Sequence, residues 1–592
     1  MGRLAFSVLV FVFLRAAICC PDLTSIDIGD LNPNLDGEIV TVIGRVEELE
    51  LGPVWANFEL VDSTGQVHVY WLFPGSPRTK PDWFDESATI QVTGTYYLEH
   101  PRHQWEPEIV ALEVRPIGPP IKGAWTITPY GAAGEVAGSC YLVSNGSVSF
   151  LVDCGSFMNS EVEGSETSTS THHDSDAFDF DVSSVEAIII THAHDDHVGR
   201  LHYFFHQNEA FDGPVFMTRA TAVIYLAKLS DLIKYSELPD EKKEEIKSRV
   251  RSQVVCYDYL KEFDVVDGVT AMFVNAGHIP GSASVVLSLH DDSGPYWVTF
   301  SGDIGPGNHP FLNPPDLASL SETGTETLVI ESTYGFIERE ERPNYLSEFY
   351  TIIRETYYNG GLVVIPTFAL DRTQRILASL VEGIRNGELP ESLKIAVGGK
   401  SSCYLTNVYL ALQEDPTLCP MYFSNTFCNT HPLDVERWEY LRGADCQGEE
   451  SPEEARDYDV VVTPSGTGGS SLSLELIKEY VSDYRTVFIK VGWAPPHSPM
   501  GQLETGTDRI TIAGETYRVH AQVYSLHGVF SGHADVVGLL DYILAFPSLR
   551  EVIITHGEDR ARMALAERIH NLLPSIEVVC PAYGEPIILR EE

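Results

Sequence analysis

The chain has 592 residues, which is more than one hydrophobic core usually serves, so we expect several domains. Its hydrophobic fraction of 43% is typical of a soluble globular protein and excludes a disordered chain. Acidic residues outnumber basic ones by 85 to 39, and the formal charge of −46 repels polyanions, which argues against nucleic-acid binding. At about 1 M salt the Debye length is roughly 3 Å, so a saline habitat would remove this objection. A merely solubilising surface explains the charge equally well.

Residues 1–20 are predicted to be a signal peptide. Arg3 precedes an apolar run over residues 4–14, and the small residues Ala16 and Ala17 follow it. This order is typical of a cleaved export signal, and the run is too short to span a bilayer comfortably. We therefore expect an exported protein, extracellular or in the cell envelope, without a stable membrane partner. An uncleaved N-terminal membrane anchor is the alternative.

Cysteine usage excludes one kind of metal site. The chain has ten cysteines, and none of those after residue 20 belongs to a CxxC pair, so cysteine zinc sites are not expected. Export would instead allow these cysteines to form disulfides.

Residues 25–117 contain five short β-type segments divided by turn residues, which predicts a small all-β barrel. The segments are 39–46, 57–61, 67–73, 88–97 and 108–114. The pattern is similar to the OB folds of nucleic-acid-binding proteins. Aromatic residues such as Trp55 and Trp71 could stack on bases, although aromatic residues on such strands are just as often core.

From Ala124 onward, apolar strand-like segments alternate with helical stretches, which predicts α/β layers. One such segment, 186–190, is followed by His192-Ala193-His194-Asp195-Asp196-His197. Two imidazoles two residues apart leave an extended backbone on the same side, and Asp196 and His197 begin a helix that can direct them to a second ion. Four ligands within six residues predict a metal site.

Further candidate ligands stand singly at the ends of later apolar segments. His278 lies in the segment Gly277–Ala283 and Asp303 in the segment Ser301–Gly305. Each alone would be an ordinary turn residue, but together with the histidine cluster they are candidate ligands. The neighbouring glycines allow the backbone to approach an ion closely.

These motifs resemble those of the metallo-β-lactamase superfamily, in its β-CASP nuclease branch. Asp153, the HxHxDH cluster, His278 and Asp303 match the successive superfamily motifs in order. Glu331, His533 and His556 resemble the β-CASP motifs A, B and C. The resemblance also covers residues 365–374, although Asp371 stands where relatives usually carry Gly, which leaves the local loop shape open.

The resemblance implies a fold and a domain order. We expect an α/β fold in which an αββα sandwich is interrupted by an α/β β-CASP domain and preceded by the OB-like barrel. The predicted boundaries are 25–117 for the barrel, 124–340 for the first part of the metallo-β-lactamase domain, 341–510 for the β-CASP domain and 511–592 for the C-terminal part.

The resemblance also implies roles for single residues and two Zn²⁺ ions per chain. One zinc would be held by His192, His194 and His278, the other by Asp196, His197 and His556, with Asp303 bridging both. Asp153 would orient these ligands from behind. The implied catalytic residues are Asp196, Glu331 and His533, with His533 protonating the leaving oxygen or binding the phosphate. Ser332 and Arg372 are the candidate substrate-binding residues.

The function predicted on this basis is hydrolysis of phosphodiester bonds in RNA or single-stranded nucleic acid by water that two metal ions activate. The enzyme would resemble ribonuclease J and the cleavage-and-polyadenylation endonuclease, either as an endonuclease or as a 5′ exonuclease, and a homodimer is possible. RNA is favoured because His556 stands at motif C, where RNA-acting family members carry histidine. The alternatives are an extracellular DNA or non-specific nuclease and a non-catalytic nucleic-acid-binding protein. A small-molecule hydrolase of the superfamily would have no use for motifs A to C.

Overall fold

A computed structural model of the chain describes residues 124–157, 177–291, 294–339, 345–469, 471–526 and 528–589, together with the backbone of five strands between residues 39 and 116. The predicted signal peptide, residues 1–20, lies outside the described residues. In the part that is described, no helix combines the length and the apolar character that crossing a membrane requires.

The five strands predicted in the N-terminal region form a closed barrel with the order β1-β2-β3-β5-β4. Strands β3 and β5 pair in parallel, and the other neighbours are antiparallel. The strands are β1 (Ile39–Leu51), β2 (Trp55–Val61), β3 (Gln66–Leu72), β4 (Thr89–Tyr97) and β5 (Glu108–Pro116). The stacking predicted for its aromatic residues depends on side chains that lie outside the description, so it stays a prediction.

Two seven-stranded sheets face each other across one apolar core. In the first sheet, Phe150 and Val152 of β8 enter this core, whereas Leu151 between them points to the other face. This alternation follows from the two-residue period of a strand. The first sheet has the order β11 (Val254–Cys256), β10 (Val215–Met217), β9 (Ala187–Ile189), β8 (Ser149–Val152), β7 (Tyr141–Ser144), β6 (Thr126–Pro129), β27 (Ile587–Ile588). The second has the order β12 (Glu262–Val266), β13 (Val269–Asn275), β14 (Ala283–Asp291), β15 (Gly294–Phe300), β16 (Thr327–Ile330), β25 (Glu551–Ile554), β26 (Glu577–Val579).

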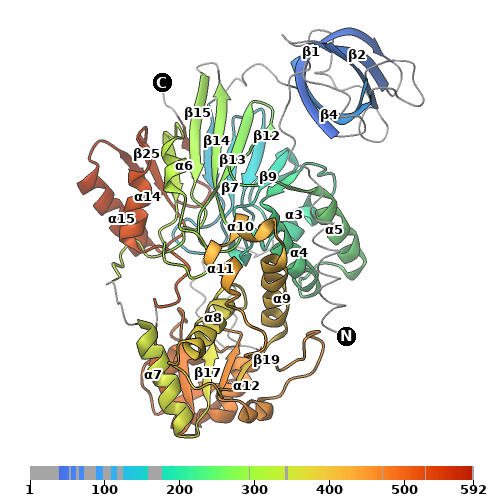
Figure 1. Ribbon diagram of the computed structural model, residues 1–592. Coiled ribbons are helices and arrows are strands. Elements are labelled where there is room, and N and C mark those ends of the chain that lie inside the picture. Colours follow the sequence, from blue (N-terminus) through green and yellow to red (C-terminus); the bar gives the residue numbers. More distant parts are fainter. Residues whose placement is uncertain are drawn as a thin grey trace.

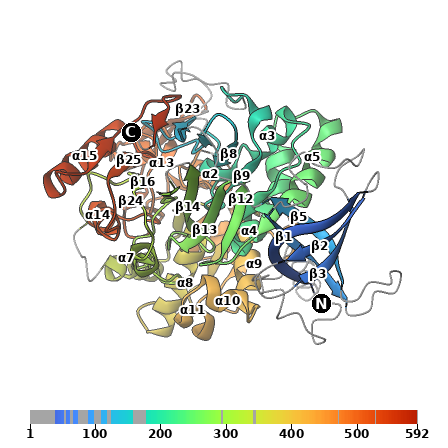
Figure 2. The same ribbon diagram turned by 90° about the horizontal axis from the view of Figure 1, so that it is seen from above.

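Helices cover the outer face of each sheet, as Figure 2 shows. The first sheet is covered by α3 (Leu201–Gln207), α4 (Arg219–Lys234) and α5 (Asp240–Gln253). The second is covered by α6 (Leu317–Ser321), α14 (Val536–Leu544) and α15 (Asp559–Leu572). The predicted αββα sandwich is confirmed.

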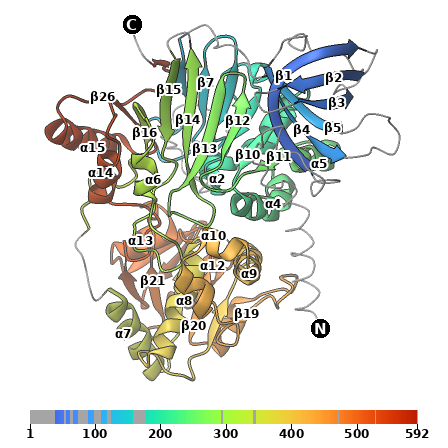
Figure 3. The same ribbon diagram turned by 45° about the horizontal axis from the view of Figure 1, so that its top comes forward.

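A third, six-stranded sheet lies below the sandwich in Figures 1 and 3. Val363 and Ile365 of β17 pack on one side of this sheet with α8 and α9, and Val364 packs on the other with α12 and α13. Its order is β19 (Glu439–Tyr440), β18 (Ile395–Val397), β20 (Val460–Thr463), β17 (Val363–Pro366), β21 (Val487–Lys490), β24 (Gln522–Ser525). Its helices are α7 (Tyr345–Tyr358), α8 (Arg372–Arg385), α9 (Lys400–Glu414), α12 (Ser471–Tyr480) and α13 (Pro499–Glu504). The predicted domain boundaries themselves stay a prediction.

The segment around α9 connects this third sheet with the sandwich. Helix α9 packs against α4, and the Lys400 ammonium lies 2.9 Å from the Asp231 carboxylate across this contact. Two disulfides, Cys403–Cys446 and Cys419–Cys428, close loops within the same segment. The remaining short elements here are α10 (Leu418–Tyr422), α11 (Asn425–Thr430) and the hairpin β22 (Arg509–Ile512) with β23 (Glu515–Arg518).

Candidate metal centre

The candidate ligands follow the carboxyl ends of strands that run in the same direction. In the first sheet, Asp153 follows β8 and His192 lies just beyond the parallel strand β9. In the second sheet, β15, β16 and β25 are parallel, and Asp303 lies beyond the first and His556 beyond the last. Because the carboxyl ends of parallel strands meet at one edge, residues far apart in sequence converge here. His197 and His556, 359 positions apart, lie with their Nε2 atoms 3.2 Å from each other.

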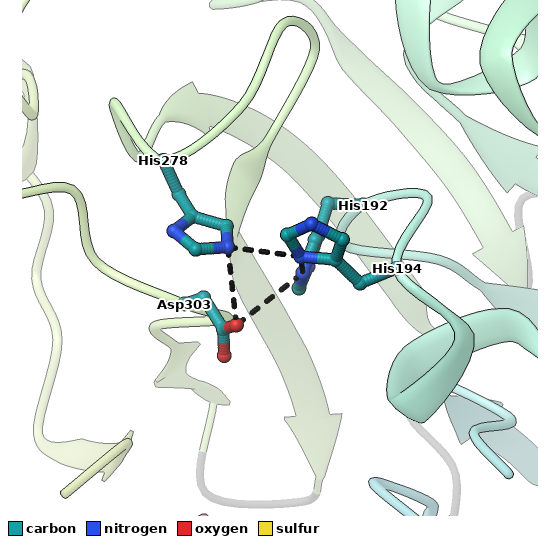
Figure 4. A group of neighbouring side chains, drawn as sticks. All are labelled: His192, His194, His278 and Asp303. Carbon is teal, nitrogen blue, oxygen red and sulfur yellow. Dashed lines mark hydrogen bonds and ion pairs between the residues drawn. The ribbon is translucent and has the colours of Figure 1, made fainter. Parts of the chain in front are cut away.

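The first group consists of His192, His194, His278 and Asp303, whose side chains point toward one another in Figure 4. His194 Nδ1 lies 3.1 Å from His192 Nε2 and 3.0 Å from His278 Nε2. Asp303 Oδ2 lies 3.4 Å from His192 Nε2 and 3.3 Å from His278 Nε2. Three ring nitrogens and one carboxylate oxygen therefore face a single point.

The second group consists of Asp196, His197 and His556. Asp196 and His197 belong to α2 (Asp195–Val198), the short helix that the sequence predicted directly after the HxH pair. His556 Nε2 lies 3.4 Å from Asp196 Oδ2, and His197 Nε2 lies 3.1 Å from Asp303 Oδ1. Asp303 therefore directs Oδ2 toward the first group and Oδ1 toward the second.

Hydrogen bonds on the far side of the imidazoles determine which nitrogen faces the centre. His197 Nδ1 lies 2.7 Å from Asp153 Oδ2, and Asp153 in turn accepts hydrogen bonds from the backbone N–H and the hydroxyl of Thr191. His278 Nδ1 donates to the carbonyl oxygen of Gly532 at 2.6 Å. When Nδ1 carries the proton of a neutral imidazole, Nε2 presents a lone pair, which is the form that binds metals.

The polar atoms of the centre are arranged for a cation. Ring nitrogens of neighbouring histidines face each other at about hydrogen-bond distance, as His194 Nδ1 does with His192 Nε2 and His278 Nε2. Asp303 is 1% exposed, and its Oδ1 accepts no hydrogen bond of good geometry from the described residues, although His197 Nε2 is near. A buried carboxylate oxygen of this kind requires compensation. The donor set of imidazole nitrogens and carboxylate oxygens fits zinc.

Burial and neighbouring charge shift the pKa values of these histidines in opposite directions. Burial, with help from His197, lowers the pKa of His192 to about 3, and burial lowers the pKa of His278 to about 4, so both rings are neutral. Burial also opposes the charged form of His197, but the carboxylates of Asp303 and Asp153 outweigh it and raise its pKa well above the usual value. A cation bound there would displace this proton.

His533 and Glu331 form a pair beside the two groups. His533 Nδ1 lies 3.1 and 3.2 Å from the two carboxylate oxygens of Glu331 and 3.8 Å from Asp303 Oδ2. Glu331 Oε1 accepts the backbone N–H of Ile304 at 2.7 Å. Burial lowers the pKa of His533, but Glu331 and Asp303 outweigh it, and the net shift is upward. The pair therefore favours an imidazolium whose Nδ1 is held by Glu331 and whose Nε2 is available.

The two candidate substrate-binding residues differ in their surroundings. Ser332 is fully buried, and its hydroxyl donates to the carbonyl of Thr555 at 2.8 Å, a contact that does not favour substrate binding. Arg372 is half-buried at the start of α8, where Nε donates to the carbonyl of Phe530 at 3.2 Å. Its guanidinium also lies over the ring of Phe368, which is 41% exposed.

Sequence reasoning missed residues that hold the site from outside. The hydroxyl of Thr333 lies 3.1 Å from Nδ1 of His556 and orients that ring. Arg339 donates from Nη1 to the carbonyl of His533 and from Nη2 to the hydroxyl of Ser531, both at 2.8 Å. The only sequence signal for Thr333 was its position as a polar residue beside Glu331, and no sequence signal pointed to Arg339.

Comparisons with known proteins agree with this geometry. Residues 133–332 match the model of the metallo-beta-lactamase superfamily, and residues 516–581 match that of the Zn-dependent metallo-hydrolase RNA specificity domain. "Ribonuclease TTHA0252" of Thermus thermophilus is 30% identical over 464 residues, which are 78% of this chain and 99% of the relative. The chain belongs to the β-CASP branch of the metallo-β-lactamase superfamily. Like the members of this branch that it resembles, this β-CASP chain is a metal-dependent hydrolase, and the matched model names zinc as the metal.

Other relatives of this β-CASP chain correct the prediction of export. "Transcription termination factor FttA" of Methanocaldococcus jannaschii is 29% identical over 75% of this chain and 68% of the relative, and that of Pyrococcus abyssi is 28% identical over 76% and 70%. The printed names of these relatives refer to transcription termination, which takes place where a genome is transcribed. The predicted export, with its membrane-anchored alternative, is therefore wrong. A short apolar run after one arginine is weaker evidence than the similarity of the remaining chain to these relatives.

Proposed function

We propose that this chain is a zinc-dependent ribonuclease that hydrolyses phosphodiester bonds in RNA or single-stranded nucleic acid. The observation that carries the proposal is the pair of ligand groups that share Asp303, with the His533–Glu331 pair beside them. The name of the Thermus relative and the RNA specificity domain matched at residues 516–581 support RNA as the substrate.

Two zinc ions per chain would occupy the two groups. His192, His194 and His278 would hold one ion and Asp196, His197 and His556 the other, with one oxygen of Asp303 toward each. Bound there, zinc would supply Lewis acidity, which activates water and neutralises phosphate charge at neutral pH. Asp196 would take part in both metal binding and catalysis, since 23% of its side chain is accessible. Its carboxylate can thus accept a hydrogen bond from incoming water.

His533 would act as the general acid. Its side chain is 17% exposed, so Nε2 reaches the substrate side while Glu331 holds Nδ1. The proton on Nε2 would pass to the oxygen that leaves phosphorus, and Glu331 would stabilise the imidazolium until then. Asp153, on the opposite side of the centre, would orient His197 and would not contact the substrate.

Arg372 would contact the RNA next to the scissile phosphate. Arg339 and Arg375 also bind residues 530–533, so three guanidinium groups gather beside the centre of a protein with a formal charge of −46. The half-exposed ring of Phe368 lies against Arg372 and offers a face on which a base can stack. Arg372 would therefore bind a phosphate of the RNA, and the neighbouring Phe368 would stack on a base.

The test is incubation of the full chain with 5′-labelled RNA and DNA of the same base sequence, single- and double-stranded, with and without chelator. We expect chelator-sensitive cleavage with single-stranded RNA cut fastest. Faster cleavage of single-stranded DNA would refute the RNA preference and favour a non-specific nuclease. Absence of cleavage together with absence of bound zinc would favour a nucleic-acid-binding protein. Product lengths separate endonucleolytic from 5′ exonucleolytic cleavage, and the predicted homodimer stays a prediction.

A further inference from the structure

Asp371 has a backbone conformation that is rare for any residue except glycine. Its φ is 66° and its ψ is −56°, and the backbone N–H of Arg372 donates to the carbonyl of Leu370 across it at 2.8 Å. These values define a tight three-residue turn that is strained for a residue with a side chain. Glycine adopts such a turn at little cost, whereas a residue with a side chain needs compensating contacts. The contacts of the Asp371 carboxylate can supply this compensation.

The side chain of Asp371 is 6% exposed, and its carboxylate lies in a buried polar network. Oδ1 accepts hydrogen bonds from His309 Nε2 at 3.0 Å and from the Tyr409 hydroxyl at 3.2 Å, and Oδ2 lies 3.7 Å from Arg375 Nη1. His309 Nδ1 accepts the backbone N–H of Phe311, so the proton of the neutral ring is on Nε2. The network therefore combines an ionised carboxylate, a guanidinium and two neutral donors.

The pKa shifts agree with this assignment. Burial raises the pKa of Asp371, but His309 and Arg375 outweigh it and bring the pKa well below its usual value. Burial lowers the pKa of His309, which keeps its imidazole neutral. Arg375 is itself 3% exposed, so its charge is compensated inside the protein. A buried ion pair of this kind is costly to break on one side only.

Arg375 carries the network to the metal centre. Its Nη1 donates to the carbonyls of Phe530 at 3.2 Å and Ser531 at 2.8 Å. The next carbonyl, that of Gly532, accepts the hydrogen bond from His278 Nδ1. A side chain at Gly532 would place its Cβ 2.9 Å from His278 Cε1, so the backbone of this loop packs directly on the ligand. A shift of the loop therefore moves the His278 ring, and with it the adjacent His533.

We propose that Asp371 is a positioning residue that couples the six-stranded sheet to the metal centre by holding Arg375 against residues 530–533. This inference rests on the proposed function, since it concerns the same site. His309 connects Asp371 to the metal centre by a second route, because it belongs to the segment that follows the ligand Asp303. The contacts of the Asp371 carboxylate offset the strain in its turn, and through Arg375 they help to position His278 and His533.

The test compares Asp371→Gly and Asp371→Asn with the wild type. Zinc affinity is measured by competition with a chromophoric chelator, and kcat and KM are measured with bis(p-nitrophenyl) phosphate and with single-stranded RNA. We expect kcat at saturating zinc to fall about 10- to 100-fold, zinc affinity to fall about 10-fold, and KM to change little, the range seen when partners of metal ligands are removed. Asp371→Asn keeps the shape of the side chain, so it separates the loss of charge from failure to fold.

A double-mutant cycle tests the route through Arg375. If Asp371 acts by holding Arg375, the variant Asp371→Gly/Arg375→Ala loses no more kcat than Arg375→Ala alone. The matched control is Tyr350→Phe, which removes a buried hydroxyl that donates to the carbonyl of Ser379 on α8. It should lower the melting temperature and leave kcat and zinc affinity unchanged.

Two results would overturn the proposal. One is a pair of Asp371 variants that lose only thermal stability, with zinc affinity and kcat of the wild type. The other is an additive double mutant. Failure of the proposed ribonuclease function has a different signature, because the zinc and small-diester measurements do not depend on RNA. A wild type that binds zinc and hydrolyses the diester but not RNA would refute the RNA substrate and leave the test of Asp371 intact.

Discussion

The metal centre and the loop of residues 530–535, which carries His533, are held in place by different means. The ligands of the metal centre follow strand ends in two packed sheets, so hydrogen-bonded β-structure determines their positions. The 530–535 loop is held by side chains instead: Arg339, Arg372 and Arg375 donate to its carbonyls. Zinc affinity should therefore depend mainly on the strand ends and on the loop only through His278, whereas proton transfer by His533 should depend more strongly on distant parts of the chain.

The two regions also differ in burial. Asp303 is 1% exposed, whereas the side chain of His533 is 17% exposed. A group that holds an ion benefits from exclusion of water, but a group that transfers a proton must reach the substrate. The predictions below separate the two regions by measuring bound zinc and turnover independently.

The largest effect is expected at the residue common to both ligand groups. Asp303→Asn leaves one oxygen in place of two, so it should lose bound zinc and at least about 1,000-fold in kcat, since charge stabilisation by metals is worth several kcal/mol. Bound zinc is measured by elemental analysis of the purified variant. Chelated wild type should regain activity when zinc is returned, which is the control. A variant with wild-type zinc content and turnover would contradict the shared role.

Removal of the proposed acid should affect turnover alone. His533→Ala is expected to keep zinc and to lower kcat by at least about 100-fold, the usual scale for an acid catalyst. The control is His570→Ala, because His570 is an exposed histidine on α15. Loss of zinc in the His533 variant would mean that the loop and the metal centre are not separable in the way described.

Removal of the orienting carboxylate should affect zinc first. Asp153→Asn takes away the negative charge 2.7 Å from His197 Nδ1, so zinc affinity should fall about 10- to 100-fold while kcat at saturating zinc changes less. A competition titration with a chelating dye measures the affinity. Asp240→Asn, at an exposed carboxylate on α5, serves as the control. Equal zinc affinities in the Asp153 variant and the wild type would exclude the orienting role.

The smallest effect is expected at the substrate surface. Phe368→Ala should raise KM for RNA about 10-fold, within the range for loss of one base stack, without changing zinc content or hydrolysis of a small diester. Tyr484→Ala is the matched control, because Tyr484 is an exposed aromatic residue that precedes β21, at the other end of the six-stranded sheet. A KM that rises equally in both variants would point to a general effect on the fold.

The metal centre could be predicted from sequence because each ligand carries a local signal. His192, His278 and Asp303 each stand just after an apolar segment, and strand direction then brings them to one edge. The alternation of apolar strand-like segments with helical stretches predicted α/β layers, and the resemblance to the superfamily implied that these layers form an αββα sandwich.

The contacts that hold the 530–535 loop had no such signal. The network of Asp371 joins residues that are 62 positions apart at His309 and, through Arg375, more than 150 apart at Ser531. The departure from Gly at Asp371 was visible in the sequence, but its partners are determined by tertiary packing alone. Ser332 is the opposite case: motif context suggested a substrate contact, its buried hydroxyl donates to the carbonyl of Thr555, and the substrate role stays a prediction.

The single carboxylate of Asp303 has a thermodynamic consequence for metal loading. Both oxygens of this buried side chain already point at the two groups, so little side-chain entropy remains to be lost when an ion binds. Ions that share the carboxylate would influence each other directly, and by linkage each would change the affinity for its neighbour by the same factor. Zinc titration of the stripped protein should accordingly differ in steepness from that of two independent sites.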